Sequence, residues 1–152
     1  MTGKHWLGAF VIVAAMLVGS RTASAQWASC TISATPISFG VYNVFSPSDL
    51  VSTGSISFSC TGFSWTMSVY LSKGSGSSNN PRQLVSGSNR INYNLYMDAS
   101  HTQIWGDPNP NSYSRTWAFN ANDTLTVYGL IPAGQDVRVG SYTDLVVATI
   151  NF

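Results

Sequence analysis

Hydrophobic and polar residues alternate with a period of two along most of the chain beyond residue 30. This alternation is typical of strands with one buried face, and it is interrupted by stretches rich in Gly, Ser, Asn and Pro at 73–81 and 101–114 that predict loops. The alternating segments, each of which predicts a strand, are 37–41, 56–60, 65–71, 91–97, 125–129 and 141–152.

The pattern predicts an all-β fold. About seven short strands without helical periodicity favour an immunoglobulin-like β-sandwich with Greek-key connections. The 152 residues allow one domain of ordinary size. Composition supports strands, because the chain holds five Trp, seven Tyr and seven Phe while charged residues make up only 9% of it.

The first 25 residues have the pattern of a secretory signal peptide. Lys4 and His5 precede an apolar run over 6–18, and Ala23, Ser24 and Ala25 supply the small residues that a signal peptidase accepts. The run is too short for a membrane span, which needs about 20 residues. We therefore predict a signal peptide over 1–25, a single domain over 26–152, and export of the chain through the periplasm.

The mature part contains two cysteines, Cys30 and Cys60. An even number of cysteines in an exported chain predicts one disulfide. Two cysteines and one histidine are too few for a structural zinc site.

Charge and candidate chemistry exclude several classes of function. Without Lys4 and Arg21, five basic residues face six Asp, and no basic run predicts binding to nucleic acid. The single mature histidine, His101, is not accompanied by a nucleophile motif, so we expect no enzyme and no cofactor. His101 lies close in sequence to Asp98 and Asp107, but their irregular spacing favours turn capping over a metal site.

Three aromatic residues lie within or just after the turn-rich segment 101–114. Exposed rings on loops suit sugars or apolar surfaces, whereas buried rings would plug one end of the sandwich, and the second interpretation is favoured. The residues of this possible recognition loop are Trp105, Tyr113 and Trp117.

The ordered set of short motifs along the mature chain resembles the spore coat protein U domain family, which includes subunits of archaic chaperone-usher pili. No single motif is specific, but together they span nearly the whole mature chain. The motifs are Cys30 with Pro36, 39–42 (FGVY), 52–54 (STG) before Cys60, 92–96 (NYNLY) with Asp98, 105–107 (WGD), 127–129 (VYG), 131–135 (IPAGQ) and 140–144 (GSYTD).

The resemblance implies an incomplete sandwich that a partner strand completes. A periplasmic chaperone fills the gap first, an outer-membrane usher receives the complex, and the N-terminal arm of a neighbouring subunit then replaces the chaperone. The last strand of this sequence fits that expectation, because its unpaired edge would border an apolar groove. We expect the groove to be lined by Val146, Ala148, Ile150 and Phe152.

The resemblance therefore predicts a structural or adhesive subunit of a fibre on the cell surface. A spore-coat-type structural protein and a free-standing carbohydrate-binding β-sandwich are the alternatives. Cleavage after Ala25 would leave only four residues before Cys30, whereas a donor arm needs about ten. This difference favours a tip or other terminal position over a repeating shaft subunit.

Overall fold

A computed structural model of the chain describes residues 28–62, 66–107, 112–115 and 121–152. The described residues form eight β-strands and no helix, so none of their segments is a helix long and apolar enough to cross a membrane. The strands are β1 (Ser29–Thr35), β2 (Leu50–Thr61), β3 (Met67–Leu71), β4 (Arg82–Ser86), β5 (Asn89–Tyr96), β6 (Tyr113–Arg115), β7 (Ala121–Ile131) and β8 (Ala148–Asn151).

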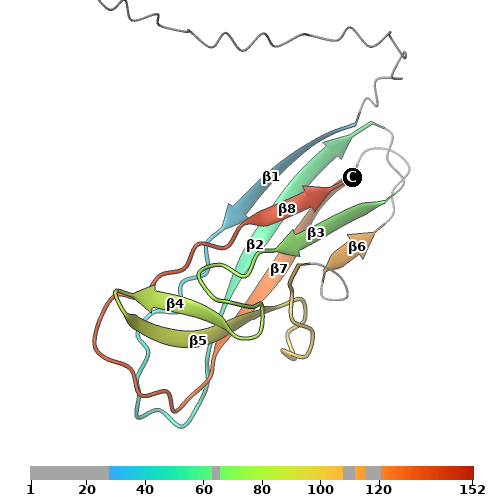
Figure 1. Cartoon of the computed structure of the whole chain (residues 1–152). Coiled ribbons are helices and arrows are strands. Elements are labelled where there is room, and N and C mark those ends of the chain that lie inside the picture. The colour runs from blue at the N-terminus through green and yellow to red at the C-terminus, as the bar shows by residue number, and fades with distance from the viewer. Residues whose placement is uncertain (1–27, 63–65, 108–111, 116–120) are drawn as a thin grey trace, which may run out of the picture.

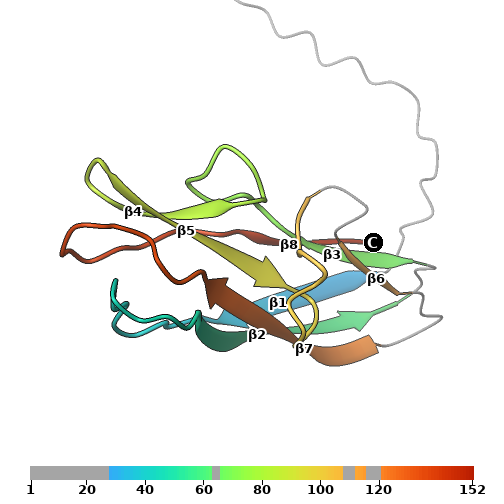
Figure 2. The same cartoon turned by 90° about the horizontal axis from the view of Figure 1, so that it is seen from below.

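The strands form two antiparallel sheets that face each other (Figures 1 and 2). One sheet has the order β1-β2-β7-β5-β4 and the other has the order β6-β3-β8. Figure 2 shows β1, β2 and β7 in one layer, with β3 and β8 in the layer opposite. This arrangement confirms the predicted all-β, immunoglobulin-like sandwich.

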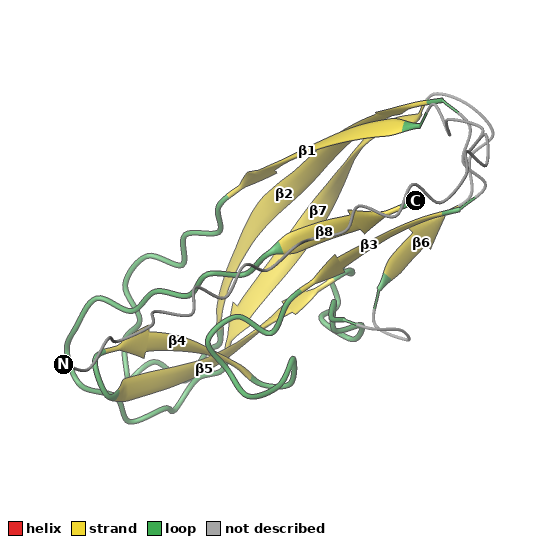
Figure 3. Ribbon diagram, turned by 45° about the horizontal axis from the view of Figure 1, so that its top comes forward, coloured by secondary structure: helices red, strands yellow, loops and turns green. Residues whose placement is uncertain are grey.

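The larger sheet curls around one side of the sandwich and leaves the other side open. On the closed side, Thr143 forms two backbone hydrogen bonds with Val85 of β4, of 2.8 and 3.0 Å. On the open side, β1 and β8 are both edge strands, and no strand pairing joins them (Figure 3). The sandwich therefore has one unclosed seam between its two sheets.

The core lies between the sheets and is built from the inward positions of the alternating segments. Ile56, Phe58 and Cys60 of β2 face Met67, Val69 and Leu71 of β3 across this core, and all six are buried. Cys30 and Cys60 are directly opposite each other on β1 and β2 and form the predicted disulfide. It closes a loop with a sequence separation of 30, which restricts the unfolded chain by roughly 3–4 kcal/mol.

Nine outward positions of β1, β2 and β7 form a surface that we call the hydroxyl face. These positions are exposed or half-exposed, and they carry eight hydroxyls and one amide but no charge. The residues are Ser29, Thr31 and Ser33 on β1, Ser57, Ser59 and Thr61 on β2, and Asn122, Thr124 and Thr126 on β7.

Two predicted strands and one predicted loop differ from the structure, and one short strand was not predicted. Residues 37–41 and 141–147 are extended but belong to no strand, apart from the bridge at Thr143, because one edge of each borders the open seam. Strand β4 lies where no clear alternation predicted a strand, and β6 begins inside the predicted loop 101–114. These two strands are short, with five and three residues, and carry little periodic signal.

A fully buried arginine, Arg82 of β4, joins several segments of the closed side. Its guanidinium donates hydrogen bonds to the carbonyl oxygens of Trp105 (2.6 Å), Ser72 (2.9 Å) and Leu71 (3.2 Å), and to Asn94 Oδ1 (3.0 Å). Burial lowers the pKa of Arg82, and no carboxylate is among its hydrogen-bond partners. The positive charge is therefore held by carbonyl dipoles instead of an ion pair.

Replacing Arg82 should destabilise the fold strongly. Arg82→Met leaves at least four acceptors without their donor, at a cost of about 1–3 kcal/mol for each one that water cannot reach. We expect the free energy of unfolding to fall by more than about 3 kcal/mol, measured by denaturant titration.

Arg90→Met, which changes an exposed arginine on the neighbouring strand, is the matched control and should change stability by less than about 0.5 kcal/mol. If Arg82→Met does not fold, Arg82→Lys, which keeps the charge but has fewer donors, should give an intermediate loss. Wild-type stability in either Arg82 variant would contradict this role.

Candidate functional site

An apolar groove runs along the open seam of the sandwich. It has a volume of ≈ 1220 Å³ and lies between two extended segments, 34–45 and 137–146. Its floor consists of core side chains, which include Ile56, Leu71, Ile91, Tyr93 and Ile131. The groove therefore opens directly onto the hydrophobic core.

The first wall, which includes residues 36–45, packs against the larger sheet at two glycines. A Cβ atom at Gly54 would lie 2.7 Å from Ile37 Cγ1, and one at Gly129 would lie 2.7 Å from Phe39 Cζ. The missing side chains allow Ile37 and Phe39 to reach the inner face of the sheet, where the Phe39 ring meets the Tyr93 ring edge to face. The wall is thus fixed by these apolar side chains, together with hydrogen bonds from Ser52 Oγ to the Ser38 carbonyl (2.7 Å) and from Tyr42 Oη to the Pro132 carbonyl (2.8 Å).

The second wall, residues 137–146, is anchored by the carboxylate of Asp144. The carboxylate of Asp144 accepts hydrogen bonds from Tyr93 Oη (2.6 Å), the backbone N–H of Ser75 (2.7 Å) and the backbone N–H of Leu145 (2.8 Å). Burial and the hydrogen bond to Asp144 raise the pKa of Tyr93 far above its usual range. Asp144 thus ties the wall to the groove floor and to the loop after β3.

The main chain of the two walls is unpaired toward the groove. No backbone–backbone hydrogen bond joins 36–42 to another described residue, although the Ser38 carbonyl accepts one from Ser52 Oγ (2.7 Å). The backbone–backbone bonds of Thr143 and Val147 lead to Val85 and Ser72. Both sides of the apolar trough thus offer main-chain N–H and C=O groups without a backbone partner. One added strand between the walls could form hydrogen bonds with these groups.

The structure places the four predicted groove residues differently. Val146 and Ala148 line the groove. Ile150 is half-buried against the core without lining the groove, and Phe152 is 47% exposed. Most of the second wall, including Asp144, was not predicted to line the groove, because its residues do not alternate regularly. For the first wall, the overlooked signal is the pair Gly54 and Gly129, which make room for Ile37 and Phe39.

The possible recognition loop does not present its aromatic residues together. Trp105 is only 1% exposed, and its indole Nε1 donates a 2.8 Å hydrogen bond to the Val69 carbonyl. Its ring lies against that of Tyr113, which is half-buried. Trp105 therefore plugs the end of the sandwich and does not serve as an exposed ring, while Trp117 lies outside the described residues.

The residues considered for metal binding also have other partners. Desolvation raises the pKa of Asp98, but the hydrogen bonds that its carboxylate accepts from Thr102 and Gln103 outweigh this effect, so the pKa is lowered. The His101 ring lies edge to face against Tyr96 and Tyr128. Within the described part of the chain, no three His, Cys, Asp or Glu side chains gather as metal ligands.

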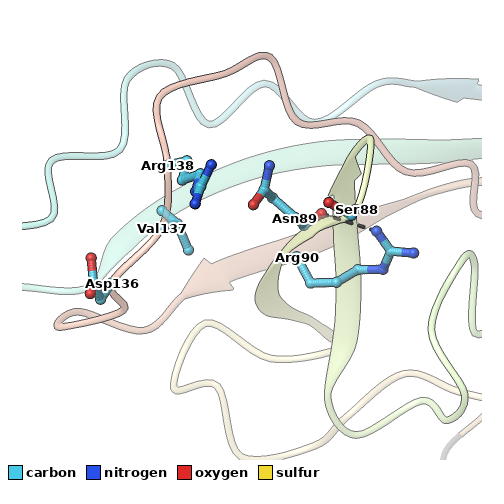
Figure 4. Close-up of a pocket in the computed structure, with 6 residues that line it drawn as sticks. All are labelled: Ser88, Asn89, Arg90, Asp136, Val137 and Arg138. Carbon is cyan, nitrogen blue, oxygen red and sulfur yellow. Dashed lines mark hydrogen bonds between the residues drawn. The ribbon is translucent and has the colours of Figure 1, made fainter.

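A second, polar pocket of ≈ 500 Å³ lies beside the β4–β5 turn (Figure 4). It is lined by Ser88, Asn89, Arg90, Asp136, Val137 and Arg138. Figure 4 shows the Arg90 side chain pointing away from Asp136 and Arg138, so these charged groups do not converge on one point. Val137 and Arg138 also line the groove, which places this pocket at the end of the groove.

Comparisons with known proteins agree with this architecture. The family model described as Spore Coat Protein U domain matches residues 14–149, so the match begins inside the predicted signal peptide. Protein U of Myxococcus xanthus is 32% identical over 111 residues, which make up 68% of this chain and 62% of that relative. The match thus spans less than two thirds of the relative's length.

A solved structure shares the fold. It is the CsuC–CsuE chaperone–tip adhesion subunit pre-assembly complex from the archaic chaperone-usher Csu pili of Acinetobacter baumannii. The similarity has a TM-score of 0.54 and 20% sequence identity, and it covers 82% of this chain and 40% of the other.

Removing the Tyr93 hydroxyl should loosen the second wall in a pH-dependent way. A hydrogen bond to a carboxylate contributes roughly 1.5–3 kcal/mol, so Tyr93→Phe should lower the free energy of unfolding by about that amount at pH 7. Above pH ~10, the usual tyrosine pKa, the unfolded wild type loses this proton while the folded protein keeps it, so wild-type stability falls.

The stability difference between wild type and Tyr93→Phe should therefore shrink as pH rises above ~10, measured by denaturant titration at several pH values. Tyr70→Phe is the control, because it tests whether loss of a different tyrosine has the same effect. A constant difference between wild type and Tyr93→Phe across this range would contradict the assigned hydrogen bond.

Proposed function

Because the chain belongs to the Spore Coat Protein U domain family, we propose that it is a secreted structural or adhesive subunit of a bacterial surface fibre. In this proposal a periplasmic chaperone holds the chain after export, and an outer-membrane usher adds it to the fibre beside other subunits. The protein has no catalytic role and no cofactor, and it acts by binding strands.

The observation that carries the proposal is the groove with two unpaired walls. A strand inserted between 36–42 and 140–146 would form main-chain hydrogen bonds on both sides and place alternate side chains on the core. Four or five apolar side chains buried there would contribute on the order of 10 kcal/mol before the cost of ordering the strand. Such a strand therefore acts as part of the fold.

The groove is suited to an uncharged, alternating partner strand. Its floor is apolar over Ile56, Ile91 and Ile131, and its nearest carboxylate, Asp144, already accepts three hydrogen bonds. The chaperone–subunit complex with the same fold supports a chaperone as the first partner.

A spore-coat-type structural protein is the second candidate. The family description and the sequence similarity to Protein U of Myxococcus xanthus favour it. Genes for a chaperone and an usher next to the gene for this chain would support the fibre, and their absence would support the coat protein. A free-standing carbohydrate-binding sandwich is disfavoured as the whole function, because it leaves the groove without a purpose.

Strand insertion into the groove can be tested with two neighbouring substitutions. Val146 lines the groove, whereas the adjacent Val147 is 55% exposed and does not line it. Val146→Asp should greatly weaken binding of a co-expressed chaperone, because a charge would be buried in the trough, while Val147→Asp should bind normally. The measurement is co-purification of the chaperone from periplasmic extract.

The same two variants should differ in binding a synthetic peptide copied from the N-terminal arm of another subunit of the fibre. Wild type and Val147→Asp should bind it, and Val146→Asp should not. Two results together would contradict the proposal. The first is a wild-type chain that is soluble and unfolds sharply without any added strand, and the second is equal binding of the chaperone and the peptide by both variants.

A terminal position in the fibre follows from the predicted cleavage site. If the mature chain begins at Gln26, its arm of four residues spans about 13 Å and covers only part of a neighbour's groove. We expect the purified chain to form no long fibres on its own, as seen by electron microscopy, with the N-terminus established by protein sequencing. Long homopolymers of a chain that begins at Gln26 would contradict the terminal position and support a role as a repeating subunit of the fibre shaft.

A further inference from the structure

The hydroxyl face lies on the outer side of the larger sheet, opposite the groove. Figure 2 shows no described segment covering the outer side of β1, β2 and β7. The middle strand, β2, is paired with β1 on one side and β7 on the other, so its backbone polar groups are already satisfied. The hydroxyls are therefore the groups that this face offers to a partner.

The hydroxyls are arranged in rows across the strands. Ser33, Ser57 and Thr124 form one row, and Thr31, Ser59 and Asn122 form the next. Neighbouring rows are about 6.6 Å apart along a strand, and neighbours within a row are about 4.8 Å apart. Ser57 Oγ and Thr124 Oγ1 hydrogen-bond each other (2.9 Å), and Thr31 Oγ1 donates to the Ser59 carbonyl (3.4 Å). Because a hydroxyl has one donor and two acceptor lone pairs, each of them still has an acceptor site, so the array can bind a partner with many hydroxyls in several registers.

An aromatic cluster continues the hydroxyl face at one end. Tyr128 follows Thr126 by two positions on β7, and it lies directly opposite Thr53 of β2 and Tyr96 of β5. The His101 ring meets the Tyr96 ring at 5.1 Å and the Tyr128 ring at 6.3 Å, measured between centroids. All three rings are half-exposed, so the cluster offers an apolar platform beside the hydroxyls.

The absence of charge on the hydroxyl face decides what kind of partner fits. A polyanion such as a nucleic acid or an acidic polysaccharide would find no cation among these residues, and the carboxylates of Asp49 and Asp98, whose charges act on Tyr96, would repel it. A membrane or an apolar protein surface would bury the hydroxyls without hydrogen bonds, which is costly. A neutral, hydroxyl-rich chain avoids both costs.

We propose that the hydroxyl face and the Tyr96–His101–Tyr128 cluster bind a neutral polysaccharide, which lies along β7. The sugar rings stack on the aromatic cluster through their C–H faces, and their hydroxyls exchange hydrogen bonds with the rows on β2 and β7. Because this surface and the groove are on opposite faces of the larger sheet, binding does not depend on the strand that fills the groove.

The test is depletion of the chain from solution by insoluble neutral polysaccharides, namely cellulose, chitin and starch. Wild type should bind at least one of them, and Tyr128→Ala and Thr124→Lys should each weaken binding roughly tenfold. Ser88→Lys, which adds the same charge on the β4–β5 turn, is the matched control and should bind as wild type does. The acidic polysaccharide alginate should not deplete the chain.

The assay uses the chain in its stable form, alone or with a chaperone bound. We expect the chain to bind the polysaccharide equally in both forms. Such a result would support this surface independently of the groove, even if the co-purification of the chaperone fails. The proposal is overturned by three results: no depletion by any neutral polysaccharide, unchanged binding in both face variants, or stronger depletion by alginate than by the neutral polymers.

Discussion

The unpaired main chain along the open seam is the constraint on which the rest of the structure depends. Here two extended segments border a trough that leads to Ile91 and Tyr93. A sandwich with such a seam must keep both walls straight without a strand between them. The side-chain contacts of the walls serve this requirement.

The two walls meet the requirement by different combinations of contacts. The first wall combines apolar packing, for which Gly54 and Gly129 make room on the sheet, with the hydrogen bond from Tyr42 to the Pro132 carbonyl. The second wall is held by polar contacts, because Asp144 binds Tyr93 and the amide of Ser75. The buried Arg82 supports the same region from behind by joining the end of β3 to the Trp105 loop.

The fold could be predicted from the sequence where side chains alternate between core and solvent. Strands β2, β3, β5 and β7, the disulfide and the loop at 73–81 follow from this alternation and from composition. The groove was predicted only at Val146 and Ala148, because the walls owe their shape to long-range contacts that no local pattern records. The Asp144–Tyr93 bond joins residues 51 positions apart, and neither residue is unusual in its own segment.

The position of the disulfide affects how the molecule responds to pulling. Strand β1 is an edge strand beside the open seam, and its chain continues directly into the first wall. Edge strands normally peel from a sheet one hydrogen bond at a time, but Cys30 and Cys60 join β1 covalently to β2, near the end of β1 that lies away from the first wall. When the first wall is pulled, peeling of β1 therefore stops at Cys30, where the disulfide passes the tension to β2.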